Sequence, residues 1–243
     1  MSLAPHDLAA PVLVANGLSR RFGGVVAVAD VSFEVRRNEV VGIIGPNGSG
    51  KTTLFNLLSG FLRPRTGTVT WNGRDITGMA PHRRARLGLV RTFQQAMVFP
   101  RLDVRENAAL ALRAGRAVER FATPEDLVEY VDLGHVLANR AGDLSWGQTR
   151  LLGIALALAA SPQVLLLDEP FAGLSPVAAD DVSAIVRKLK GDGYSLAVID
   201  HELSHLLPIC DRLVVLANGV ELASGNPSEV VERADVRTAY LGL

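Results

Sequence analysis

A glycine-rich loop is the part of this 243-residue chain whose residue types point most directly to chemistry. The loop comprises Gly45, Pro46, Asn47, Gly48, Ser49, Gly50, Lys51, Thr52 and Thr53. Its glycines let backbone N–H groups converge on phosphates, and a helix start adds about half a positive charge. We expect Lys51 to reach the β and γ phosphates of a nucleotide, Thr52 to hold Mg²⁺ and Thr53 to support the α phosphate. A plain glycine-rich turn is disfavoured by the apolar run VVGII before the loop and the helical pattern after it.

An acidic pair follows a second apolar run, in the segment VLLLDEP from Val164 to Pro170. A buried strand here would carry Asp168 to the carboxyl edge of a sheet, where its carboxylate can hold Mg²⁺ directly or through water. The next residue, Glu169, is suited to orient or deprotonate an attacking water, so we interpret it as the general base. The alternative is an ordinary acidic turn, which the phosphate loop upstream disfavours.

The pentapeptide LSWGQ, from Leu144 to Gln148, lies between these two segments. Ser145 and Gln148 have the spacing of a capping box, which would start any helix. A capped helix start also presents N–H groups and a hydroxyl at a positive end, so a cap and a phosphate ligand are compatible roles. We therefore interpret Ser145, Gly147 and Gln148 as a second phosphate-binding helix start, one that a subunit cannot easily bring to its own loop.

Apolar runs and helical patterns alternate along the chain. Strands are predicted at about residues 12–15, 31–35, 40–44, 68–71, 89–93, 164–167, 195–199 and 213–217. Helices are predicted at about residues 51–59, 81–87, 104–114, 124–131, 146–160, 176–190, 202–208 and 227–241. Asn218 and Gly219, between apolar runs, predict a tight hairpin. This order predicts an α/β fold with a mainly parallel sheet and phosphate chemistry at its strand ends.

The stretch from about residue 95 to 160 has strong helical signals and no convincing strand. We expect it to form a helical subdomain inserted in the α/β core. The length suits one domain of this kind, so residues 1–243 are predicted to be a single domain.

Composition limits the classes of partner. The 25 basic and 25 acidic side chains cancel, so nothing indicates a nucleic-acid or anionic-membrane partner. The longest apolar run, Leu151 to Ala160, is shorter than the roughly 20 residues that cross a bilayer. The start, MSLAPHDLAAP, lacks the basic leader and apolar core of a signal peptide. The single cysteine, Cys210, is expected to be a packing side chain in a reducing compartment.

These motifs, in this order, resemble the ATP-binding subunits of ATP-binding-cassette (ABC) transporters over nearly the whole chain. The resemblance implies a P-loop ATPase fold of that type, with an antiparallel β subdomain beside the core. It also implies that Phe22 stacks on adenine, that Gln94 senses Mg²⁺ and water and links to membrane subunits, and that His201 hydrogen-bonds the γ phosphate. It further implies a head-to-tail dimer with two ATP molecules, each between one subunit's phosphate loop and the other's LSWGQ.

Three longer matches, RRFGGVVAVADVSF, PHRRARLGLVRTFQ and TAYLG, resemble the ATPase subunits of branched-chain amino acid importers, whose relatives also move urea and short amides. The resemblance implies a peripheral subunit on the cytoplasmic face of the inner membrane. It would contact the membrane only through permease subunits and pair with an identical or a related ATPase. We expect Arg83, Arg84 and Arg86 to form a solvated helix face, and we prefer this interpretation to a specific anion site.

The chain departs from this family where it carries Trp146, Gly153, Leu156 and Ser175. Relatives commonly have glutamate and arginine in place of Gly153 and Leu156, so a polar pair is replaced as a unit and the fold should be retained. Three other functions stay open. They are a lipid or glycolipid exporter ATPase, a non-transport cassette ATPase of translation or DNA repair, and a P-loop kinase or GTPase, which would need neither LSWGQ nor a switch histidine.

Overall fold

The computed structural model of the chain describes residues 11–94, 97–115 and 121–241. Its strands form two sheets, a six-stranded sheet in the order β10-β9-β3-β8-β7-β6 and a four-stranded sheet in the order β2-β1-β4-β5. Neighbours from β9 to β6 in the larger sheet pair in parallel, and β10 pairs antiparallel with β9. The predicted fold class is therefore confirmed, with a mainly parallel sheet, an antiparallel sheet and surrounding helices.

The strands are β1 (Pro11–Phe22), β2 (Val25–Arg36), β3 (Val40–Ile44), β4 (Thr66–Trp71), β5 (Arg74–Asp75), β6 (Leu89–Arg91), β7 (Val164–Asp168), β8 (Ser195–Ile199), β9 (Arg212–Ala217) and β10 (Val220–Gly225). The helices are α1 (Lys51–Ser59), α2 (Pro81–Leu87), α3 (Val104–Ala114), α4 (Pro124–Tyr130), α5 (Trp146–Leu158), α6 (Pro176–Gly191), α7 (Leu203–Leu206), α8 (Pro227–Glu232) and α9 (Ala234–Leu241). Two short 3₁₀ turns, η2 (Gly134–Val136) and η3 (Ala141–Asp143), precede α5.

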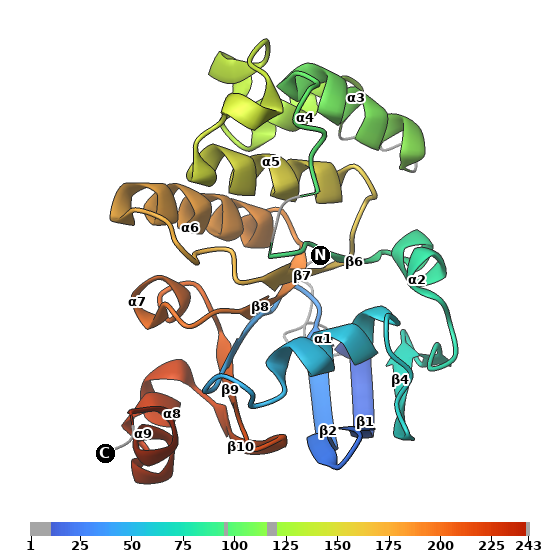
Figure 1. Cartoon of the computed structure of the whole chain (residues 1–243), viewed down its shortest axis with the longest axis vertical. Helices are drawn as coiled ribbons and strands as arrows, with labels where there is room; N and C mark the ends of the chain where they lie inside the picture. The colour runs from blue at the N-terminus through green and yellow to red at the C-terminus, as the bar shows by residue number, and fades with distance from the viewer. Residues whose placement is uncertain (1–10, 95–96, 116–120, 242–243) are drawn as a thin grey trace, which may run out of the picture.

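Figure 1 shows how the elements are arranged along the long axis of the molecule. The helices α3, α4 and α5 lie at the upper end, α6 lies below α5, and α1 lies at the lower end with β1, β2 and β4. Strands β7 and β8 run between these two groups. Within the described part of residues 97–160 there are helices and no named strand. The subdomain boundaries, and the single-domain division of residues 1–243, remain predictions.

Both faces of the six-stranded sheet are covered by apolar side chains. On β7, Leu165 and Leu167 belong to a core that includes side chains of α3 to α6, whereas Leu166 belongs to a second core with side chains of α1 and the four-stranded sheet. Every residue of β3 and of β7 is buried. Strands covered on both faces read as continuous apolar runs, which is why the sequence reveals them.

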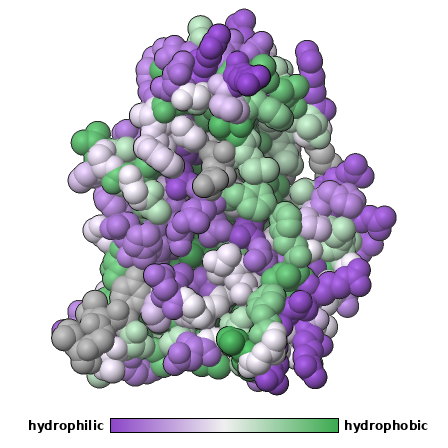
Figure 2. All heavy atoms as spheres, in the orientation of Figure 1, coloured by the Kyte–Doolittle hydropathy of each residue, from purple (hydrophilic) through white to green (hydrophobic). Residues whose placement is uncertain are grey.

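On the outer surface, hydrophilic side chains dominate the upper end and the right-hand margin of the face drawn in Figure 2, and apolar side chains reach the surface between them. Cys210 is half-buried against the first core, and burial raises the pKa of its thiol to about 11, as expected for a packing side chain. Within the described residues, no helix is long and apolar enough to cross a bilayer. The predictions on the leader and on the last residue of TAYLG fall on residues 1–10 and 242, outside the described residues.

Three element predictions are wrong. Strands β1 and β2 are each twelve residues long, because they pair along their length as a hairpin that extends far beyond the predicted apolar runs. Strand β5 was not predicted. The helix predicted over 227–241 is two helices, α8 and α9, separated at Arg233, which has an extended backbone. Val230 and Val236 are both buried, and on one continuous helix they would point about 120° apart.

The predicted solvated arginine face on α2 is wrong for one of its three residues. Arg83 and Arg86 are exposed, but Arg84 is completely buried. Its guanidinium donates hydrogen bonds to the carbonyl oxygens of Leu57, Leu58, Thr77 and Met79, at 2.6 to 3.0 Å. Burial lowers the pKa of Arg84 to about 10, so the side chain is still charged at neutral pH. This arginine joins the last turn of α1 to the segment that follows β5.

Replacing Arg84 with methionine should lower the free energy of unfolding by about 3 kcal/mol or more, because the buried carbonyl oxygens lose a charged donor. Urea unfolding followed by circular dichroism measures this change. The matched control is Arg83→Met on the same helix, which should change the free energy by at most about 0.5 kcal/mol. Equal stabilities of the two variants would contradict the role given to Arg84.

Candidate active site

The parallel register of three strands brings the predicted chemical segments to one edge of the sheet. Ile199, the last residue of β8, pairs with Ile43 of β3 on one side and with Asp168 of β7 on the other. The glycine-rich loop follows β3, the acidic pair ends β7, and His201 follows β8. Segments that are more than 100 residues apart in the sequence therefore meet at the carboxyl ends of adjacent strands, the usual site of ligand binding in such sheets.

The glycine-rich loop has a backbone that only glycine can adopt at two positions. Gly50 has φ 105°, and a Cβ there would lie 2.4 Å from the carbonyl oxygen of Ala27. At Gly45 a Cβ would lie 2.1 Å from the carbonyl oxygen of Leu216. Helix α1 starts directly after Gly50 without a side-chain cap, so its first N–H groups are available to an anion.

Lys51 and Ser49 are the polar side chains of this loop that a bound anion would contact. The Lys51 ammonium donates to the carbonyl oxygens of Gly45 and Pro46, at 2.6 and 3.0 Å. Burial lowers the pKa of Lys51, while Glu169 and Asp168 act in the opposite direction. The Ser49 hydroxyl is buried and has no hydrogen-bond partner among the described residues. A phosphate would supply both an acceptor for that hydroxyl and a counter-charge for the ammonium, so these residues fit a nucleotide.

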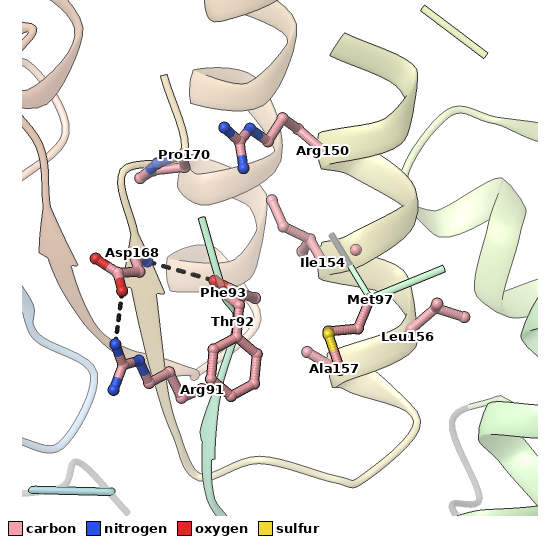
Figure 3. Close-up of a pocket in the computed structure, with 11 residues that line it drawn as sticks. Arg91, Thr92, Phe93, Met97, Arg150, Ile154, Leu156, Ala157, Asp168 and Pro170 are labelled. Carbon is pink, nitrogen blue, oxygen red and sulfur yellow. Dashed lines mark hydrogen bonds and ion pairs between the residues drawn. The ribbon is translucent and has the colours of Figure 1, made fainter. Parts of the chain in front are cut away.

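The acidic pair is held by the strand beside it. One carboxylate oxygen of Asp168, Oδ2, accepts a hydrogen bond from Arg91 Nη2 at 2.7 Å, and the Asp168 N–H donates to Thr92 Oγ1 at 3.3 Å (Figure 3). Glu169 has a left-handed backbone, φ 50°, and its Oε2 accepts from Gln94 Nε2 at 2.7 Å. The structure therefore brings the predicted residues Gln94, Asp168 and Glu169 together, and it adds Arg91.

Asp200 is a buried acid that lies outside the predicted site residues. It is completely buried at the end of β8, and its carboxylate accepts from the backbone N–H groups of Phe171, His201 and Glu202. Burial raises the pKa of Asp200, and these N–H bonds oppose the change. His201 Nδ1 lies 3.8 Å from the Asp200 carboxylate, and half of the His201 side chain is exposed. Asp200 thus fixes the loop that carries the predicted switch histidine, and an acid directly after a buried strand was the available signal.

The pentapeptide LSWGQ starts α5 as predicted. Ser145 Oγ accepts from the Gln148 N–H at 3.2 Å, and Gln148 Oε1 accepts from the Ser145 N–H at 3.0 Å, so the capping box is confirmed. Gly147 is buried, and a Cβ there would lie 2.8 Å from Ala178 Cβ on α6. Trp146 is 70% exposed. Figure 1 shows α5 in the upper part of the molecule and α1 in the lower part, so the structure does not bring LSWGQ to the loop of the same chain.

Phe22 is the last residue of β1. The residue is 45% exposed, and the Arg20 guanidinium carbon lies 5.2 Å from the ring centroid. An exposed aromatic side chain can stack on a base, and the role of Phe22 in adenine binding stays a prediction.

A cavity of about 280 Å³ lies between α5 and the end of β6 (Figure 3). Gly153 and Leu156, the two departures on α5, line it together with Met97 and Phe93. Arg150 also lines it, and burial lowers the pKa of Arg150, against the opposing effect of Asp200, Glu169 and Asp168. Arg150 is therefore the charged side chain that α5 contributes to this lining, beside Gly153, Ile154, Leu156 and Ala157 of the same helix.

The comparison with protein families decides between the possible P-loop functions. The family model described as "ABC transporter" matches residues 28–172, a range that contains the glycine-rich loop, LSWGQ and the acidic pair. The chain belongs to the ABC transporter family. Like other ATP-binding members of that family, it is an ATPase of a transporter.

Individual relatives cover nearly all of this ABC protein. The branched-chain amino acid transport ATP-binding protein BraF of Pseudomonas aeruginosa is 38% identical over 250 residues, covering 96% of this chain and 98% of its own. The lipopolysaccharide export ATP-binding protein LptB of Haemophilus influenzae is 36% identical over 234 residues, covering 95% and 97%. Among solved structures, the ADP conformation of MJ1267, an ATP-binding cassette of an ABC transporter, superposes with a TM-score of 0.85 at 31% identity, covering 96% and 100%.

Proposed function

We propose that this chain is the ATP-hydrolysing subunit of a membrane transporter that imports branched-chain amino acids or related small solutes. The observation that carries the proposal is the Glu169 carboxylate, fixed by Gln94 at the same sheet edge as the Lys51 loop. The family match supports ATP hydrolysis, and the BraF relative supports the solute class.

In this proposal, the loop from Gly45 to Thr53 holds the ATP phosphates. The N–H groups of the first turn of α1 would donate to phosphate oxygens. The Lys51 ammonium would also donate to phosphate oxygens, which would replace the loop carbonyls as its acceptors. Phe22 would stack on adenine, and His201 would donate to the γ phosphate. Asp200 would keep the His201 backbone in place through the N–H bond of 2.7 Å.

Mg²⁺ would be held by Thr52, Gln94 and Asp168 together with phosphate oxygens. Among the described residues, no three histidine, cysteine or acidic side chains form a metal cage, and Mg²⁺ commonly binds through one or two carboxylates plus phosphate and water. When bound, Mg²⁺ would neutralise phosphate charge and help orient the phosphates. These side chains have the chemistry for that ion.

Glu169 would act as the general base toward the attacking water. The hydrogen bond from Gln94 orients its carboxylate, and the bond from the Glu169 N–H to the Ile199 carbonyl, 2.8 Å, fixes the left-handed turn. A carboxylate that is held in this way loses little freedom when it accepts a proton from water.

Replacing Glu169 with glutamine should lower ATP turnover by about 10²- to 10⁴-fold, because the amide cannot accept the proton. Nucleotide affinity should be nearly unchanged, since the Lys51 loop is intact. Phosphate release and the binding of a fluorescent ATP analogue measure the two effects. Glu229→Gln, an exposed carboxyl on α8 outside the loops that form the site, is the control. Wild-type turnover in Glu169→Gln would remove Glu169 from this role.

The ATP site would be completed by a second subunit, either another copy of this chain or a related ATPase. Supporting this arrangement, Ser145 is an exposed cap at the positive end of α5, and α5 lies away from α1 in the same chain. In the dimer, Ser145, Gly147 and Gln148 of one subunit would face the phosphates held by the other.

Two Ser145 variants separate the capping role from the ligand role. Both aspartate and asparagine are good N-caps, but aspartate places a negative charge against the phosphates. Ser145→Asp should therefore abolish ATPase activity, whereas Ser145→Asn should retain most of it. Mixing Ser145→Asp with the inactive Lys51→Ala should restore about a quarter of the wild-type activity, since half of random dimers carry one intact site of two. No recovery, together with no ATP-dependent dimer in light scattering, would contradict a site shared between two copies.

The transport function would be exerted through separate permease subunits, with this chain peripheral to the cytoplasmic face of the inner membrane. BraF is named for amino acid transport, whereas LptB is named for lipopolysaccharide export. Identity does not separate the two, because both BraF and an LptB of Acidithiobacillus ferridurans are 38% identical to this chain. Import is favoured by the segments RRFGGVVAVADVSF, PHRRARLGLVRTFQ and TAYLG, which resemble importer ATPases. Export of a glycolipid is the second candidate, carried by the LptB match.

Deletion of the gene in its own organism should distinguish these candidates. High-affinity uptake of radiolabelled leucine should fall by about tenfold or more, because a transporter without its ATPase has no power stroke. A copy with Glu169→Gln should fail to restore uptake, and wild-type and Glu229→Gln copies should restore it. Normal leucine uptake with a defect in surface lipopolysaccharide would overturn the importer and support the exporter.

A further inference from the structure

A buried ion pair lies beside the proposed Mg²⁺ site. Arg91 Nη2 and Asp168 Oδ2 are 2.7 Å apart, and the two side chains are only 5% and 9% exposed. Figure 3 shows the guanidinium of Arg91 pointing to the Asp168 carboxylate from the neighbouring strand. Arg91 ends β6, three residues before Gln94.

The guanidinium is fixed by other contacts as well as by this carboxylate. Its Nη1 lies 2.7 Å from Asn56 Oδ1 and 3.3 Å from Ser59 Oγ, both on α1. Its central carbon lies 5.6 Å from the ring centroid of Phe55 and 5.4 Å from that of Phe93. Arg91 therefore keeps its place through α1 and the two rings, whatever Asp168 binds.

The buried Asp168 carboxylate requires a counter-ion. A carboxylate with so little access to water needs a cation, and in the metal-free protein Arg91 is the cation in hydrogen-bond contact with Asp168. Arg91 bonds to Oδ2 of the carboxylate, and the other oxygen, Oδ1, accepts no hydrogen bond from any described residue. A divalent ion at Oδ1 would share the carboxylate with a fixed positive charge.

We propose that Arg91 is a positioning residue for Asp168. The Arg91 guanidinium is the counter-ion of this carboxylate in the metal-free protein, and its positive charge opposes the binding of Mg²⁺ to the same carboxylate. Arg91 would then set the Mg²⁺ concentration at which nucleotide binding becomes metal-dependent. This inference rests on the proposed function, in which Asp168 is a ligand of Mg²⁺. Arg91 lies three residues before Gln94 in the same segment, and its side chain connects that segment to α1 and to Asp168.

The test compares nucleotide binding in Arg91 variants over a range of Mg²⁺ concentrations. In Arg91→Met, the Mg²⁺ concentration for half-maximal tightening of ADP binding should fall by about tenfold or more, since a nearby positive charge is gone. Arg91→Lys retains the charge and should stay close to the wild type. If Arg91→Met does not fold, Arg91→Gln removes the charge and keeps a hydrogen-bond donor.

Thermal unfolding provides a second readout that does not depend on activity. In EDTA, Arg91→Met should melt well below the wild type, because the buried Asp168 carboxylate loses the cation that is hydrogen-bonded to it. Adding Mg²⁺ to the ADP complex should raise its melting temperature by about 5 °C more than it raises that of the wild type. Arg84→Met is the matched control, a buried arginine that binds only carbonyls, and its response to Mg²⁺ should equal that of the wild type.

The possible failures are distinguishable. If Mg²⁺ affects ADP binding in the wild type, and Arg91→Met or Arg91→Gln requires as much Mg²⁺ as the wild type or more, Arg91 is not the competing counter-ion. If ADP binding in the wild type does not respond to Mg²⁺, the proposed nucleotide and metal site itself is wrong.

Discussion

The site depends on the parallel register of β3, β8 and β7. This register places the loop with Lys51 level with the end of β7, where Asp168 and Glu169 lie, and with the end of β8, where Asp200 lies. The result is a partly buried lysine among acids, in which burial weakens the hold of the ammonium on its proton and the acids strengthen it. Such a balance is useful only where the ligand is itself highly charged, as a nucleotide triphosphate is.

The antiparallel elements help to hold the phosphate loop against this edge. The N–H of Gly219, in the β9–β10 turn, donates to the Ser49 carbonyl at 3.1 Å, and the Gly219 carbonyl accepts from the Ala29 N–H at 2.8 Å. Gly50 packs against the Ala27 carbonyl of the same strand, β2. The loop is thus enclosed by backbone from both sheets, and its glycines are required by close approach as much as by the ligand.

Sequence reasoning succeeded where the signal is local. The bounds of α1, α2, α3, β3 and β8 were predicted to the residue, and the capping box at Ser145 needs only residues within one turn. It could not find contacts made by tertiary pairing. Arg91 meets Asp168 across 77 residues, and a single arginine in RTFQ has no local feature that predicts such a partner. Arg84 was misjudged for the same reason, since its carbonyl partners come from α1 and from the segment beyond β5.

The bonds made by Arg84 also bear on how this sequence can change over time. All of them go to main-chain carbonyl oxygens, so they survive substitution of the side chains at Leu57, Leu58, Thr77 and Met79. The arginine itself has no such latitude, because no other side chain offers the same planar set of donors. The link between the phosphate-binding helix and the segment after β5 therefore depends on the side chain at one position, residue 84. The residues that supply the carbonyl oxygens can be substituted without loss of these hydrogen bonds.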